Sequence, residues 1–298
     1  MFHADGVSPY GDGFAPDVVA IDMAGNGSYP DLEGYPGPLF NDLADTSNTT
    51  DQSPDLSRRA AKDFYLRVMP LGASITEGVM SSDGNGYRKW IRSQLRWKGW
   101  RVNMVGSKQN GDMADQDNEG HPGWTIDQVH NAFTTSKWMM PNLVLINAGL
   151  NDCVQGIDTN NAGQRLKAMV DDIFNSIPGV TVVLSTLLRN RDQDACTEKV
   201  SQQIQGLMGV YGNARIGLAD IRSVMSMNDL SSDGTHPNDG GYKLFAGVWW
   251  NAISQLENNI QPPTTVTGMN DALVDSSKTC KKVAGNAGAT VQSQLGSG

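Results

Sequence analysis

The feature that most constrains the fold is a regular alternation of short apolar runs with amphipathic segments, beginning at Leu66. Short, continuous apolar runs predict strands buried on both faces, and apolar residues spaced three and four positions apart predict helices between them. Strands that alternate with helices indicate a parallel sheet covered on both sides. We therefore predict a three-layer α/β/α sandwich with a doubly wound, five-stranded parallel sheet.

Five apolar runs are expected to form the strands of this sheet: Leu66–Leu71, Val102–Val105, Leu143–Asn147, Val180–Ser185 and Ile216–Ala219. Functional sites in such folds lie at the carboxyl ends of the strands. The segments that directly follow these runs are therefore the expected location of any chemistry.

Composition divides the chain into three parts. Residues 1–60 form an acidic, Gly- and Asp-rich N-terminal extension that has no sustained periodicity and no Lys or Arg before Arg58. Residues 61–260 contain the alternating pattern and form the predicted main domain. Residues 261–298 begin with Pro-Pro-Thr-Thr, which is typical of a linker. They continue as a polar, Gly-rich stretch that is either a C-terminal tail or the beginning of a further module.

The charge pattern excludes some classes of partner. The formal net charge is −9, and most of the acidic excess lies in the N-terminal extension. A protein without a basic patch has no electrostatic means to bind nucleic acid or an anionic membrane surface. No apolar run is long enough to span a bilayer, so we expect no membrane span. Residues 1–15 lack the features of a signal peptide, which fits either an intracellular protein or a mature chain with a new Met.

The cysteines favour secretion. Cys153 follows the third predicted strand and Cys196 lies in the loop after the fourth, so their sulfur atoms can meet at one edge of the sheet. We predict a disulfide between them, which leaves Cys280 free or paired elsewhere. Two glycosylation sequons, at Asn26 and Asn48, also fit a secreted protein. The alternative is that Cys153 is a small buried residue of a cytosolic protein and never oxidises.

A serine directly follows the first predicted strand, in the segment Pro70–Gly78 (PLGASITEG). At the carboxyl end of a strand and flanked by glycines, Ser74 can project its hydroxyl into the site crevice. A serine beside glycine is also common as a helix cap or turn residue. Ser74 alone is therefore only a candidate nucleophile.

A histidine in the segment Ser232–Asn238 (SDGTHPN) strengthens that interpretation. A serine hydroxyl needs a base to attack at neutral pH, and an imidazole needs a partner that fixes its tautomer. His236 can supply the base, and Asp233 can accept a hydrogen bond from its Nδ1. The alternative is that Asp233 and Asn238 only cap the next helix and that His236 is a surface residue.

Hydrogen-bond donors follow two further strands. Gly106 ends the second predicted strand and offers an uncrowded backbone N–H, and Asn151 follows the third strand in Asn147–Asp152 (NAGLND). With the N–H of Ser74, they can form an oxyanion hole with three donors. Each residue also has an ordinary explanation, as a strand-ending glycine or a turn asparagine.

Taken together, the segments around Ser74, Gly106, Asn151 and His236 resemble, in order and spacing, the four sequence blocks of the SGNH (GDSL-type) hydrolases, across residues 64 to 258. The resemblance implies a flavodoxin-like SGNH fold. It assigns Ser74 as nucleophile, with Asp233 and His236 completing the triad. The N–H groups of Ser74 and Gly106 and the side chain of Asn151 form the oxyanion hole in this assignment.

Longer matches, Met69–Gly78 and Glu119–Trp124 (EGHPGW), are similar to the acetyl xylan esterase branch, carbohydrate esterase family 3. Two positions depart from the usual family pattern: Ala73 stands in place of Asp, and Leu150 in place of Thr. Neither position has a triad role, so the resemblance still implies activity, whereas local hydrogen bonding and substrate fit are altered.

His121 and Trp124 are expected to line the cleft and bind substrate. Acidic residues near His121 would also suit a metal, but no paired His or Cys spacing supports a metal site. The expected reaction is two-step acyl transfer, which requires no metal or organic cofactor. The expected substrate is a small acyl ester, acetate above all, on plant cell-wall polysaccharide. The alternatives are a lipid or lysophospholipid esterase and a non-catalytic carbohydrate-binding protein on the same fold.

Overall fold

The computed structural model describes residues 63–212 and 215–272, and the structural statements below concern these residues. The whole N-terminal extension (residues 1–60), with both sequons, lies outside the described residues, as does the chain after residue 272, which includes Cys280. The domain boundaries expected at residues 60 and 260 stay predictions.

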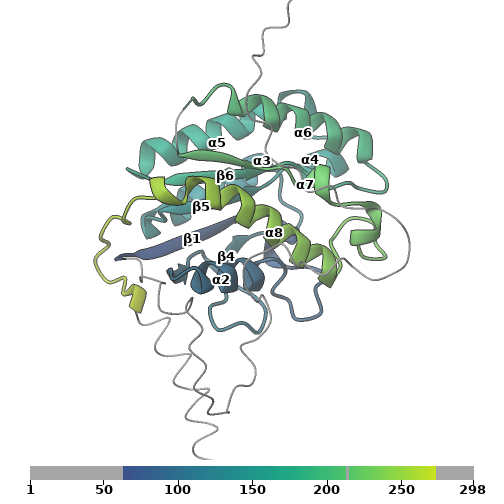
Figure 1. Cartoon of the computed structure of the whole chain (residues 1–298). Helices are drawn as coiled ribbons and strands as arrows, with labels where there is room; N and C mark the ends of the chain where they lie inside the picture. Colours follow the sequence, from purple (N-terminus) through teal and green to yellow (C-terminus); the bar gives the residue numbers. More distant parts are fainter. Residues whose placement is uncertain (1–62, 213–214, 273–298) are drawn as a thin grey trace, which may run out of the picture. The chain divides into compact units, whose positions relative to one another are not determined.

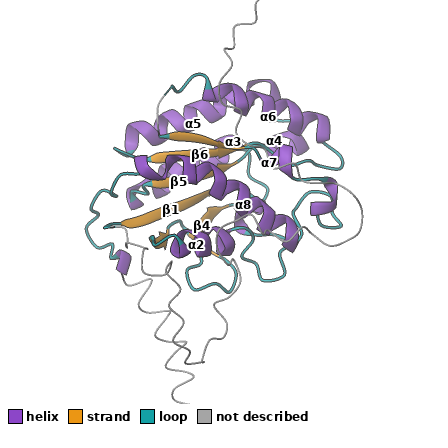
Figure 2. Cartoon of the chain, in the orientation of Figure 1, coloured by secondary structure: helices purple, strands orange, loops and turns teal. Residues whose placement is uncertain are grey.

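The described part of the chain forms a seven-stranded sheet, with helices on both of its faces (Figures 1 and 2). The strands are β1 (Tyr65–Gly72), β2 (Arg101–Met104), β3 (Lys108–Gln109), β4 (Asp117–Gly120), β5 (Leu143–Asn147), β6 (Thr181–Ser185) and β7 (Ile216–Ala219). The five predicted strands pair in parallel in the order β2-β1-β5-β6-β7. This is the order of a flavodoxin-like doubly wound sheet.

The helices are separated by short connections. The α-helices are α1 (Ser74–Glu77), α2 (Arg88–Trp97), α3 (Ile126–Ser136), α4 (Leu150–Gln155), α5 (Ala162–Ser176), α6 (Asp194–Met208), α7 (Ile221–Val224) and α8 (Asp239–Leu256). The short 3-10 helices are η2 (Lys137–Met139), η3 (Thr159–Asn161), η4 (Met227–Asp229) and η5 (Glu257–Asn259).

The two faces of the sheet carry separate apolar cores. Successive residues of a strand point to opposite faces, so Val68 packs toward α2 and α8, whereas Met69 packs toward α3, α5 and α6. Figure 1 shows α8 in front of the strands and α5 and α6 away from it. Strands β5 and β6 are buried along their whole length, which explains their continuous apolar sequences. The predicted three-layer α/β/α sandwich is confirmed.

One edge of the sheet changes partner halfway along β1. The first half of β1 pairs with β2, and the second half pairs with β4, where Leu71 is opposite Glu119. Strands β3 and β4 form a short antiparallel hairpin that sequence analysis did not predict. Gly106 lies where the chain leaves β2. A Cβ atom there would lie 2.1 Å from the carbonyl oxygen of Asn118 in the hairpin, so only glycine fits.

Residues 261–272 contact the other end of the sheet. Asn142 donates through Nδ2 to the carbonyl of Gln261 at 2.9 Å. Arg67, on β1, donates from Nε and Nη2 to the two carboxylate oxygens of Asp271, at 2.7 and 2.9 Å. Arg67 also donates from Nη1 to the carbonyl of Thr264, at 2.7 Å. A buried arginine of the sheet therefore holds the described residues that follow Gln261.

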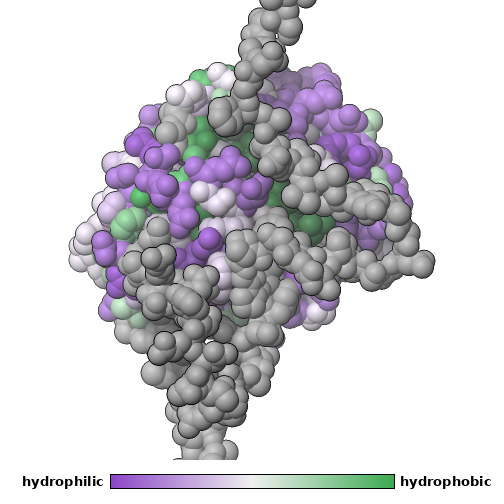
Figure 3. Space-filling view, viewed as in Figure 1, coloured by the Kyte–Doolittle hydropathy of each residue, from purple (hydrophilic) through white to green (hydrophobic). Residues whose placement is uncertain are grey.

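On the face shown in Figure 3, the described residues are largely hydrophilic, and hydrophobic side chains occupy small separate areas. None of the described helices has the length and apolar character that crossing a bilayer requires.

Candidate active site

Ser74 is the first residue of α1, directly beyond the carboxyl end of β1, and its exposed fraction is 8%. The first N–H groups of a helix have no partner within the helix, so the Ser74 amide is available to a ligand. Beside it, Gly72 is in register with Asn147 at the end of β5. The structure therefore places Ser74 at the point where the strand order of the sheet reverses, which is the usual ligand site of such folds.

His236 joins Ser74 to Asp233. The Nε2 atom of His236 lies 2.8 Å from the Ser74 Oγ, and its Nδ1 lies 2.7 Å from Oδ2 of Asp233. The carboxylate accepts at Nδ1, so that nitrogen carries the hydrogen and Nε2 is left to accept from the serine hydroxyl. This is the order of contacts that serine activation by a general base requires.

Both oxygens of the Asp233 carboxylate accept hydrogen bonds. Its Oδ1 accepts from the backbone N–H groups of Thr235 and His236, at 2.9 and 3.0 Å. Burial raises the pKa of Asp233, but the hydrogen bonds from the His236 ring and from the two amides outweigh it. The net pKa lies below the ordinary value of 3.8. Asp233 is therefore ionised at neutral pH and can stabilise an imidazolium.

Two residues that sequence analysis missed hold this turn. Arg191 donates from Nη1 and Nη2 to the carbonyls of Ser232 and Asp233, at 3.0 and 2.8 Å, and its backbone N–H donates to Gly234. Asn190 donates to the hydroxyl of Thr235 at 3.0 Å. No sequence signal could have identified them, because the loop after β6 has no periodic pattern. Asn238, by contrast, caps α8 through its contact with the Gly241 N–H, as its alternative interpretation expected.

Gly106 follows β2, at the edge of the sheet. The next residue, Ser107, is fixed by Glu119, whose Oε2 accepts the Ser107 N–H and whose Oε1 accepts its hydroxyl, both at 2.7 Å. Glu119 is 1% exposed. The last β1–β2 contact runs from the Val105 N–H to the Val68 carbonyl. The next N–H along the chain, that of Gly106, donates to no acceptor among the described residues. It is therefore available to an oxyanion.

Asn151 lies in α4, which follows β5. Its Nδ2 donates one hydrogen to the carbonyl of Trp124 at 2.9 Å. The second amide hydrogen is left for another acceptor. The neighbouring Asp152 is completely buried and anchors the helix: Oδ2 accepts from the Ile126 N–H at 3.0 Å, and Oδ1 pairs with Arg165 at 2.7 Å. Burial raises the pKa of Asp152 above its ordinary value, although these partners oppose the shift.

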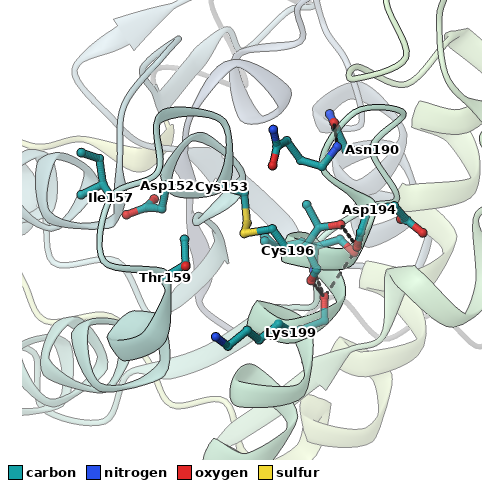
Figure 4. Close-up of a disulfide and its surroundings, with 12 residues drawn as sticks. Asp152, Cys153, Ile157, Thr159, Asn190, Asp194, Cys196 and Lys199 are labelled. Carbon is teal, nitrogen blue, oxygen red and sulfur yellow. Dashed lines mark hydrogen bonds between the residues drawn. A yellow bond between two sulfur atoms is a disulfide. The ribbon is translucent and has the colours of Figure 1, made fainter.

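A disulfide joins Cys153 to Cys196, in agreement with the predicted pairing (Figure 4). The two Cα atoms are 5.7 Å apart. The expectation that Cys196 lies in a loop is wrong. Helix α6 begins at Asp194, so Cys196 lies in its first turn. The acidic side chain of Asp194 favours the start of a helix there, because it interacts with the positive end of the helix dipole. Helix α4, which carries Asn151, is thereby linked covalently to α6.

The structure places His121 and Trp124 together, beside the end of β1. Their rings are stacked, with centroids 4.0 Å apart. The backbone N–H of His121 donates to the carbonyl of Gly72 at 3.0 Å, two residues before Ser74. The Nε2 atom of His121 lies 2.7 Å from Oε1 of Glu119. All seven residues expected in the site therefore lie beyond the carboxyl ends of strands, in the helices that begin there or in loops and turns.

Within residues 63–212 and 215–272, no group of three or more His, Cys, Asp or Glu side chains is arranged to hold a metal ion.

Besides the loop residues Asn190 and Arg191, the sequence prediction missed the supporting roles of Glu119 and Asp152. Both lie inside sequence motifs of the site, Glu119–Trp124 and Asn147–Asp152, and an acidic residue within such a motif is the signal that could have identified them.

The sequence profile of the GDSL-like lipase/acylhydrolase family matches residues 71–244, which is more than half of the chain. The chain therefore belongs to this family.

Individual relatives agree with this assignment. A family 3 carbohydrate esterase of Clostridium thermocellum superposes with a TM-score of 0.58 at 27% identity, covering 66% of this chain and all of that one. A family 3 carbohydrate esterase of Talaromyces cellulolyticus has a TM-score of 0.59 at 24% identity, with the same coverage, and supports the fold. A multidomain esterase of Ruminococcus flavefaciens is 26% identical over 251 residues, which are 74% of this chain. The chain spans only about a third (32%) of that esterase.

Proposed function

We propose that the chain is a serine esterase that removes small acyl groups, acetate above all, from plant cell-wall polysaccharide. Ser74 attacks the ester carbonyl while His236 takes its proton and Asp233 stabilises the resulting imidazolium. The N–H groups of Ser74 and Gly106 and the Asn151 amide hold the oxyanion. When the intermediate collapses, His236 returns the proton to the leaving alcohol oxygen, and the acyl group stays on Ser74. His236 then takes a proton from water, which attacks the acyl-serine, releases the acid and restores the Ser74 hydroxyl. The proposed mechanism requires no metal or organic cofactor.

The observation that carries this proposal is the unbroken line of contacts from the Ser74 hydroxyl through both His236 nitrogens to Asp233, at 2.8 and 2.7 Å. A serine that served only as a helix cap would not need an imidazole whose other nitrogen is held by a carboxylate. The Gly106 N–H and the second Asn151 hydrogen supply two donors that bond to no acceptor among the described residues. This arrangement favours an enzyme over a binding protein.

The similarity to the Clostridium thermocellum carbohydrate esterase supports an acylated carbohydrate as the substrate. The similarity to a multidomain esterase fits a chain that acts beside a further module. We further propose that the protein is secreted, because the Cys153–Cys196 pairing suits an oxidising compartment.

The test compares wild type with Ser74→Ala on 4-nitrophenyl acetate, on longer nitrophenyl esters and on acetylated xylan. Ser74→Ala should lower kcat by roughly a thousandfold or more. The control is Ser254→Ala, which changes an exposed serine on α8 and should keep full activity. Turnover near wild type in folded Ser74→Ala would refute the mechanism. A preference for long acyl chains would favour a lipid esterase, and xylan binding without turnover would favour a binding protein.

A further inference from the structure

Glu119 is a buried carboxylate that contacts both Ser107, the residue after Gly106, and His121. It accepts the Ser107 amide, the Ser107 hydroxyl and the His121 ring, each at 2.7 Å. It lies on β4, in register with Leu71 of β1. Its position is therefore fixed by the sheet and by three hydrogen bonds.

These contacts determine the hydrogen positions of His121. A carboxylate only accepts hydrogen bonds, so Nε2 of His121 must carry the hydrogen that points to Glu119. In the neutral ring, Nδ1 is then an acceptor. Among the described residues, no donor bonds to this Nδ1. His121 thus presents an acceptor with no partner in the protein, directed away from Glu119.

His121 is hydrogen-bonded to the strand that leads to Ser74. The His121 N–H is bonded to Gly72, two residues before Ser74, and the His121 ring stacks on Trp124. The carbonyl of Trp124 in turn accepts from Asn151. The His121 side chain is 12% exposed, so part of the ring is accessible to substrate. The ring is held at Nε2 by Glu119 and on one face by Trp124.

We propose that Glu119 fixes the tautomer of His121 so that Nδ1 accepts a hydrogen bond from a hydroxyl group next to the ester, on the alcohol part of the substrate. The pair would select esters of polyhydroxylated alcohols, such as sugars, over esters of simple alcohols. This inference rests on the proposed esterase function. Glu119 acts as a positioning residue, and His121 is the group that contacts substrate.

The test uses two matched esters: a monoacetylated methyl xyloside and its analogue in which the neighbouring hydroxyls are replaced by hydrogen. The measured quantity is the ratio of their kcat/KM values, because a general loss of activity cancels in the ratio. One hydrogen bond to a neutral group should give the wild type a preference of about two- to tenfold for the hydroxylated ester.

His121→Gln keeps a polar group at the Nε2 position and removes Nδ1, so the preference should vanish. His121→Asn keeps an acceptor at the Nδ1 position and should retain part of it. Glu119→Gln lets the new amide donate to Nε2, which moves the ring hydrogen to Nδ1. The substrate hydroxyl would then have to accept instead of donate, so the preference should fall. The control is His130→Gln, since His130 pairs with Asp172 at 3.1 Å on the surface of α3 and should leave the ratio unchanged.

An unchanged ratio in His121→Gln and Glu119→Gln, or equal ratios in His121→Asn and His121→Gln, would overturn the inference. An equal loss in His130→Gln would also overturn it. If Ser74→Ala remained active, the proposed function itself would fail. If Ser74→Ala were inactive and the ratios did not move, only the role of Glu119 and His121 would be wrong.

Discussion

Asp271 should be essential for stability, although it is far in sequence from the sheet that it contacts. Asp271 is 14% exposed and its partner Arg67 is 4% exposed, and the two form a bidentate ion pair. Asn103 adds a third contact to the same carboxylate, at 2.8 Å. Asp271→Ala would leave the buried guanidinium with backbone carbonyls alone, chiefly that of Thr264. Removing one partner of a buried pair costs about 3–5 kcal/mol.

Urea unfolding followed by circular dichroism measures this loss of free energy. The double variant Arg67→Met, Asp271→Leu is the control, because replacing both members of a buried pair by apolar residues is often neutral. It should recover most of the loss. Truncation after Gln261 should cost at least as much as Asp271→Ala. A loss below about 1 kcal/mol, the range of exposed ion pairs, would refute the reasoning.

Four further outcomes follow from the site. Asn151→Ala should lower kcat by about a hundredfold to a thousandfold with little change in KM, because its hydrogen bond matures in the transition state; a change in KM alone would make Asn151 a binding residue. Gly106→Ala should lower activity and stability together, since the hairpin leaves no space for a Cβ atom, as steady-state kinetics and thermal unfolding would show. Asp233 should titrate below pH 3.8 in carboxylate NMR. Because its folded pKa is depressed, its contribution to stability is present above pH 3.8 and is lost as the pH falls through the folded value. Non-reducing peptide mapping should find the Cys153–Cys196 peptide, and Cys153→Ala should cost about 4 kcal/mol in the chain-entropy model; two free thiols in material from an oxidising host would contradict both.

The buried strands could be predicted because burial on both faces imposes continuous apolar runs. The run Leu143–Asn147 coincides with β5, and the first run differs from β1 by one residue at each end. The run Ile216–Ala219 coincides with β7, although that edge strand is only partly buried. Placement of the polar site residues followed from the same strands, since parallel strands bring their carboxyl ends to one edge. The disulfide could be predicted for the same reason.

The hairpin β3–β4 could not be predicted, because its strands are short and polar. Side-chain contacts hold it, such as those of Asn118 and Glu119, and these leave no periodic pattern in the sequence. The contact between Arg67 and Asp271 is hidden for another reason. The two residues are 204 positions apart, and a polar segment after a Pro-Pro pair looks like a linker. Long-range pairing of single charged residues has no local signature.

Helix α4 has a consequence for the order of folding. It is six residues long, too short to be stable alone, and it depends on contacts with Trp124, Ile126, Arg165 and Cys196. These partners come from the turn before α3, from α3 itself, and from α5 and α6. We therefore expect the Asn151 amide to reach its place only after that whole layer has assembled. Under the proposed mechanism, a partly folded chain would lack one oxyanion donor, so ester turnover should return only late in refolding.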